Sequence, residues 1–172
     1  RLIAQTQFER IHTVYLFNQG ERLLRQGDHE KALARISHLL STVLSMQDDV
    51  EIPRLCLIAA EALQAAGRHD EARQFADRAR VHAAQFGLVP ELLSFGVISG
   101  RLALDAGDYE KAFREFKQAI QIAKEISQSI KVASDRADFQ KRREIGFMVD
   151  EIGRLGLILG QKNRAGTEPA RA

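Results

Sequence analysis

Five histidines and one cysteine are the side chains of this sequence best suited to catalysis or metal binding. Histidine acts as a general base and a metal ligand, and a cysteine thiolate is a nucleophile. The histidines are scattered over separate stretches, at His12, His29, His38, His69 and His82. His29 and His69 follow two similar turns, where half-buried packing is expected, and Cys56 lies in an apolar stretch typical of a core. The sequence therefore predicts no catalytic residue and no metal ligand among these six.

Two further patterns resemble ligand sites only in part. Asp48, Asp49 and Glu51 bring three carboxylates together, but they lack the glycine turn and the bidentate glutamate of a calcium loop. The glycines around residue 156 lack the preceding strand that a dinucleotide-binding loop requires. We therefore expect no enzymatic activity, no cofactor and no bound metal.

The elements that position these residues follow from three similar turns. Their glycines are 40 residues apart, and an alanine stands five residues after each glycine. Glycine adopts the left-handed conformation that ends a helix, an aspartate after it can cap the next helix, and alanine lets two helices cross closely. The turn residues are Gly27, Asp28, Ala32, Gly67, Ala72, Gly107, Asp108 and Ala112. A fixed period of this length predicts an array of antiparallel helix pairs.

Apolar residues recur at steps of three and four and predict the helices themselves. We expect helices at 2–26, 29–46, 51–66, 68–86, 91–106, from 108 onward, and at about 139–160. The sixth should run for about 30 residues, because no glycine or proline interrupts it before Gly146. The seventh should pack along it, or form a seam with another chain. Gly160 and Ala165 repeat the turn spacing. They predict that the first helix of a fourth pair ends at Gly160.

One turn resembles that of a known family. The run 107–112, Gly-Asp-Tyr-Glu-Lys-Ala, is similar to the turn of the tetratricopeptide repeat, and Gly20 and Gly100 match the small residue of its first helix. The family's large aromatic residue is replaced here, by Leu16, Cys56 and Gly96. The period is also longer than the family's ~34 residues, as in its long-helix branches.

The resemblance implies an all-α fold, an α-solenoid of antiparallel hairpins with about seven helices. Repeats are expected at about 10–50, 51–89 and 90–130, with a partial one at 139–165. We expect one helical repeat domain over 1–165 and a flexible tail at 166–172.

Composition limits the partners. The net charge of +2 is too small for a nucleic-acid field to dominate binding, and no apolar run approaches the ~20 residues that span a bilayer. A single cysteine fits a reducing compartment, so we expect a cytoplasmic location. The first residue is Arg rather than Met, so we expect a piece of a longer protein.

In the tetratricopeptide family the first helix of each pair lines a concave groove that binds peptides or partner helices. The resemblance places the groove residues here at Phe17, Glu21, Leu24, Arg25, Leu57, Glu61, Gln64, Val97, Arg101, Leu104, Asp150, Arg154 and Leu157. Family members that grip acidic chaperone tails use basic and amide side chains at such positions. Glu21 and Glu61 are acidic there, so we do not expect that ligand.

The expected function is therefore a protein–protein interaction scaffold. Its groove would bind a peptide or helix of a partner protein, or another domain of its parent chain. One alternative is a self-association module that dimerises through the helices between 108 and 160. Another is the regulatory sensor domain of a bacterial signalling or transcription protein, by analogy alone. No nucleic-acid or membrane partner is expected.

Overall fold

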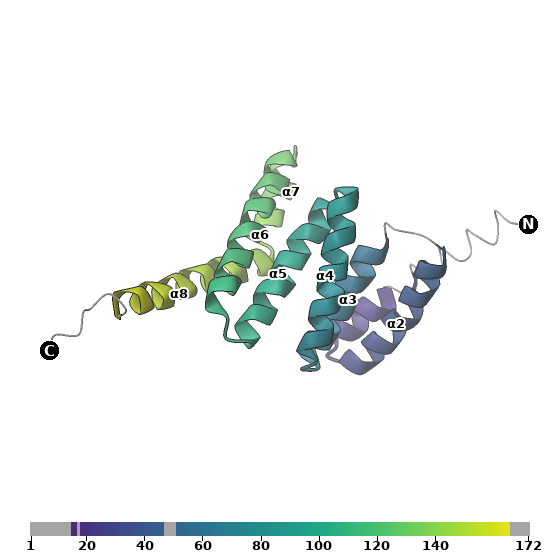
Figure 1. The fold of residues 1–172 in the computed structure, drawn as a ribbon. Coiled ribbons are helices and arrows are strands. Elements are labelled where there is room, and N and C mark those ends of the chain that lie inside the picture. The colour runs from purple at the N-terminus through teal and green to yellow at the C-terminus, as the bar shows by residue number, and fades with distance from the viewer. Residues whose placement is uncertain (1–14, 17, 47–50, 166–172) are drawn as a thin grey trace, which may run out of the picture. The chain divides into compact units, whose positions relative to one another are not determined.

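The protein is helical throughout the part that the structure, a computed structural model, describes, namely residues 15–16, 18–46 and 51–165 (Figure 1). Residues 15–16 and 18–25 form a helix that is here called the N-terminal helix. The others are α2 (His29–Met46), α3 (Glu51–Ala65), α4 (His69–Phe86), α5 (Val89–Asp105), α6 (Tyr109–Ser129), α7 (Ala133–Gln140) and α8 (Arg143–Ala165). The chain divides into two compact units, Arg1–Glu91 and Leu92–Ala172, and each is described by itself.

The chain reverses at the three glycines spaced 40 residues apart. Gly27, Gly67 and Gly107 have φ values of 80°, 75° and 73°, in the left-handed region that favours glycine. In each turn the residue after the glycine donates its amide to the carbonyl five residues earlier, in a Schellman motif. These bonds are Asp28 to Leu23 at 3.0 Å, Arg68 to Leu63 at 2.8 Å and Asp108 to Ala103 at 2.9 Å.

The residue after each turn glycine also begins the next helix, so the connection has no spare residue. Its carbonyl accepts the amide of the alanine four residues on, at 2.9–3.0 Å in all three turns. Asp108 Oδ1 accepts the Lys111 amide at 3.0 Å as an N-cap. The three alanines, Ala32, Ala72 and Ala112, are fully buried. The short connection and the small side chain together hold each helix pair antiparallel and close.

The first unit packs α3 between α2 and α4. On α4 the buried side chains form an alanine stripe, Ala72, Ala76, Ala79 and Ala83, whose spacing places them on one helix face. Larger residues fill the other side of the interface, including Leu55 and Leu63 of α3. Figure 1 shows α3 and α4 side by side over most of their length. The interface therefore combines a smooth small-residue face with a bulky one.

The second unit is built around Phe116 of α6, which is fully buried. Its ring lies against Gly100 of α5, where a Cβ atom would overlap the ring. The ring of Phe147, on α8, meets it edge-on with centroids 5.7 Å apart. Met148 and Leu155 of α8 are also buried in this cluster. The three helices α5, α6 and α8 therefore share one core.

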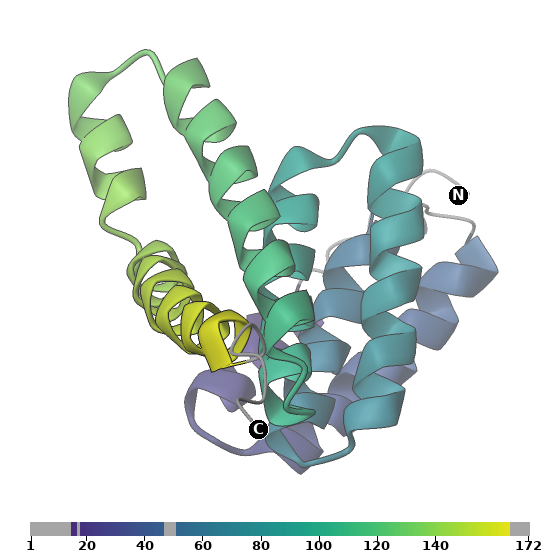
Figure 2. The same ribbon diagram turned by 60° about the vertical axis from the view of Figure 1, so that its left-hand side comes forward.

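The prediction of a single helix of about 30 residues from 108 is wrong. α6 ends at Ser129, and Ile130 and Val132 adopt extended conformations. The Arg136 guanidinium donates to the Ile130 carbonyl at 2.6 and 3.1 Å, which satisfies a backbone acceptor that the ended helix leaves open. The chain turns back into α7 beside the end of α6 (Figure 2), and α8 then packs against α6. The expected packing of the later helix against α6 is therefore correct, but a short helix intervenes.

The turn predicted at Gly160 is also wrong. α8 continues through Gly160 to Ala165, and this glycine does not have the positive φ of the turn glycines. A glycine in a helix interior costs only ~1 kcal/mol relative to alanine, and Gln161, Lys162 and Arg164 are good helix formers. Gln161 stands where the other turns have Asp or Arg, and the glycine alone does not stop the helix.

Candidate functional site

Cys56, a possible nucleophile by residue type, is part of the core. The side chain is fully buried in α3. Burial raises the pKa of its thiol to about 11, against a smaller opposing effect of the Arg78 charge. The group is therefore protonated near neutral pH and inaccessible, as expected for a small core residue.

Histidines and carboxylates do not gather into a metal-binding cluster in the described part of the chain. His29 and His69 are half-buried at the first residues of α2 and α4, in line with their equivalent positions after two turns. Asp48 and Asp49, which belong to the acidic loop considered above, lie outside the described residues.

The predicted groove positions of the first unit differ in exposure. On the N-terminal helix Glu21 and Leu24 are half-buried and Arg25 is exposed, with Glu21 and Arg25 forming an ion pair at 3.8 Å. On α3 Glu61 is exposed, Gln64 is half-buried and Leu57 is only 6% exposed. Leu57 would therefore support exposed neighbours rather than meet a partner directly. Phe17 lies outside the described residues.

On α5 the predicted groove positions face the core of the second unit. Val97 is buried among the core residues, and Leu104 is partly buried against them. The Arg101 guanidinium lies over the Phe147 ring of α8, 5.0 Å from its centroid, at cation–π distance. These side chains contribute to the packing of α8, so that a partner could reach only the exposed parts of Arg101 and Leu104.

On α8 the predicted positions are the most accessible. Asp150 is exposed, and Leu157 is 72% exposed, the highest value for a large hydrophobic side chain in the described part of the chain. Arg154 donates to Glu151 at 2.5 and 2.9 Å, and this hydrogen bonding raises the pKa of the arginine. The pair fixes the guanidinium on the helix surface beside Leu157. Asp150, Arg154 and Leu157 are therefore accessible to a partner on the surface of α8.

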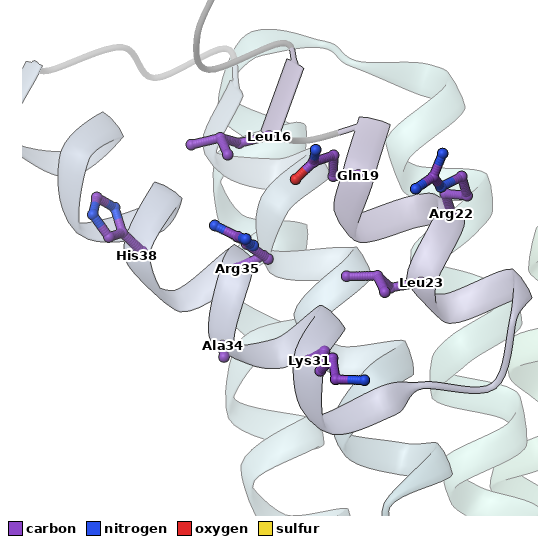
Figure 3. Close-up of a pocket in the computed structure, with 8 residues that line it drawn as sticks. All are labelled: Leu16, Gln19, Arg22, Leu23, Lys31, Ala34, Arg35 and His38. Atoms are coloured by element: carbon purple, nitrogen blue, oxygen red, sulfur yellow. The ribbon is translucent and has the colours of Figure 1, made fainter.

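A pocket that sequence reasoning missed lies between the N-terminal helix and α2 (Figure 3). It has a volume of about 590 Å³ and is lined by Leu16, Gln19, Arg22, Leu23, Lys31, Ala34, Arg35 and His38. The spacing of Lys31, Arg35 and His38 could have revealed a basic stripe on one face of α2. The stripe lies on α2, the second helix of its pair, whereas the predicted partner sites lie on first helices.

No helix in the described part of the chain combines the length and apolar character needed to cross a membrane.

Comparisons with known proteins point to one family. A sequence model of the tetratricopeptide repeat matches residues 13–36 and 53–78, which include the N-terminal helix and α3 from residue 53 onward. No curated protein matches the chain significantly. Both matched segments begin before a turn glycine and extend beyond it, so the family signal lies in the helix pairs described above.

Two solved structures share the fold. The Sgt2 TPR domain from Aspergillus fumigatus is 18% identical, with a TM-score of 0.62 over 94% of this chain and 87% of that one. A TPR-like protein from Chlorobium tepidum TLS is 19% identical, with a TM-score of 0.69 over 87% of this chain and 98% of that one. This likeness confirms the predicted α-solenoid of antiparallel hairpins. The chain is thus similar to the tetratricopeptide repeat family in the segments 13–36 and 53–78 and in its fold.

Proposed function

We propose that this chain is a non-catalytic scaffold that binds a peptide or helix of a protein partner, or another domain of its parent chain. Proteins with tetratricopeptide repeats generally mediate protein–protein interaction. The contact surfaces we propose are formed, on each unit by itself, by exposed side chains of the first helix of each pair and of α8. In the first unit they are Arg25 and Glu61, with the half-buried Glu21, Leu24 and Gln64 at the margins. In the second unit they are Asp150, Arg154 and Leu157, with the half-buried Arg101 and Leu104 at the margins.

The exposure of Leu157 is the observation that supports this proposal most directly. A leucine that is 72% exposed gains free energy when a partner covers it, by ~25 cal/mol for each Å² removed from water. The charges near it, Asp150 and the Arg154–Glu151 pair, have both signs. Such a surface favours a partner with an apolar anchor and mixed charges, rather than one of high net charge.

Matched substitutions test the surface. Leu157→Asp on α8 has a control in Val81→Asp on α4, since both replace an exposed apolar residue. Glu61→Lys on α3 has a control in Asp77→Lys on α4, since both reverse an exposed acid. A tagged chain captures partners from lysate of its source cells, and the affinity of each purified partner is then measured by calorimetry. We expect Leu157→Asp and Glu61→Lys each to weaken binding by about tenfold, and the controls to leave it unchanged.

Circular dichroism must show equal helix content in all four variants. Equal loss of affinity in a test variant and its control would mean that charge or solubility, not the proposed surface, determines binding. Unchanged affinity in both test variants would rule the surface out.

Self-association is a second candidate, favoured by the outer face of α8. Val149 is 55% exposed, and Gly146, Gly153 and Gly160 recur on the same face with no atom near the position of an added Cβ. A smooth face of this kind would allow a second helix to approach closely. Light scattering over a hundredfold concentration range distinguishes the candidates, because a mass that stays monomeric excludes the dimer. A dimer disrupted by Val149→Asp would support it.

A further inference from the structure

We propose that the pocket between the N-terminal helix and α2 binds a short acidic peptide segment that carries an apolar side chain. The pocket lies on the first helix pair and is separate from the surface proposed above. None of its eight described lining residues is acidic, whereas Arg22, Lys31 and Arg35 are cationic. A concave site lined by one sign of charge attracts the opposite sign.

The two arginines are the main source of this attraction. Lys31 is already paired with Asp28 at 2.5 Å, and that partner neutralises part of its charge. Arg22 and Arg35 are exposed, and neither forms an ion pair with a carboxylate within the described residues. They come from different helices and flank the same space (Figure 3). A guanidinium presents a planar fork of donors that suits a carboxylate, so two of them suit a segment with two acidic residues.

The apolar part of the lining supplies the second half of the recognition. Leu16 is 9% exposed, and Leu23 is half-buried on the same helix. Ala34 of α2 leaves room opposite them because its side chain is small. A cavity of about 590 Å³ holds a few residues at most. The fitting occupant is therefore a short segment in which acidic residues alternate with an apolar one.

This inference rests on the proposed function only in taking the occupant to be a protein segment. The two sites have no residue in common. A failure of peptide binding here leaves the Leu157 and Glu61 tests standing, and a failure of those tests leaves this pocket standing.

The test uses the full chain labelled with ¹⁵N and the capped peptide acetyl-Glu-Leu-Asp-Leu-Glu-amide. Capping removes the terminal charges, so that only side chains act as anions. We expect amide shifts that cluster at the lining residues and an affinity that falls as salt is raised. Arg22→Glu together with Arg35→Glu should weaken peptide binding by about 100-fold, because each charge-assisted hydrogen bond raises the affinity by about tenfold.

Three controls decide the interpretation. Arg114→Glu with Lys124→Glu changes the net charge equally at exposed positions of α6, and it should leave the affinity unchanged. The neutral peptide acetyl-Gln-Leu-Asn-Leu-Gln-amide should not bind, and inorganic phosphate should bind far more weakly than the acidic peptide. The proposal is overturned by any of four results. These are no shifts, shifts elsewhere, equal binding of the neutral peptide, and phosphate binding as tight as that of the acidic peptide.

Discussion

Replacing Gly100 with alanine should destabilise the second unit, although the same change stabilises most helices. A Cβ atom at this position would overlap one atom of the Phe116 ring and lie 2.6 and 2.7 Å from two others. Contacts this short require one group to move. The ring cannot swing into solvent, because Phe116 is fully buried and Phe147 stands edge-on against it. The overlap must therefore be relieved by separating α5 from α6 or by displacing α8.

The expected change in unfolding free energy for Gly100→Ala is the sum of two opposing effects. Overpacking a core costs up to about 3 kcal/mol, and the upper value applies here because a rigid buried ring is displaced. Alanine in place of glycine in a helix interior stabilises the helix by about 1 kcal/mol. The expected net loss is thus about 2 kcal/mol of unfolding free energy.

Gly153→Ala on α8 is the matched control. Gly153 is exposed, and a Cβ atom there would have no neighbour within 4 Å. Only the helix propensity then changes, so this variant should gain about 1 kcal/mol. The two identical substitutions should therefore differ by about 3 kcal/mol. Urea unfolding followed by circular dichroism measures this, with hydrogen exchange of α5 and α6 amides to assign the loss to the second unit, since helical repeats need not unfold as one.

A Gly100→Ala variant as stable as the parent would refute this reasoning. It would mean that the close approach of α5 to Phe116 is not a constraint on the sequence. A loss of equal size in Gly153→Ala would refute it in another way, because the cost could not then come from contact with the ring.

Four other outcomes are expected. Gly67→Ala should lose about 1–2 kcal/mol in urea unfolding, since its φ of 75° is left-handed and alanine is strained there. Asp108→Ala should lose about 1 kcal/mol in the same assay, and Asp108→Asn almost nothing, because asparagine still caps α6. Cys56 should resist a thiol reagent at pH 8 and react after unfolding, as its pKa is raised to about 11 and it is buried. The hydrogen bond from Lys31 lowers the pKa of Asp28. The contribution of this pair to the stability of the fold is therefore complete above pH ~4 and is lost as the pH falls through the lowered pKa. Asp28→Asn should flatten this part of an acid-unfolding curve.

The sequence by itself determined the helix pairs, because their turns depend on local bonds. A Schellman turn joins residues no more than five apart, and an N-cap joins residues three apart, as at Gly107 and Asp108. α2 accordingly runs from His29 to Met46, over the predicted range. The same local rules place Ala32 and its equivalents against a neighbouring helix. Nothing remote in sequence is needed for these features.

Contacts between residues farther apart in the sequence than a single turn decided the rest. α6 ends at Ser129, where Arg136 donates to the Ile130 carbonyl and Gln140 donates to Ser127 at 3.0 Å. Local propensity favoured continuation, because no glycine or proline stands there. The burial of Val97 and the pocket between the N-terminal helix and α2 likewise depend on which helix faces meet. The apolar periodicity predicts which residues share one face of a helix. Only the packing of the helices decides whether the chain itself covers that face or leaves it open to a partner.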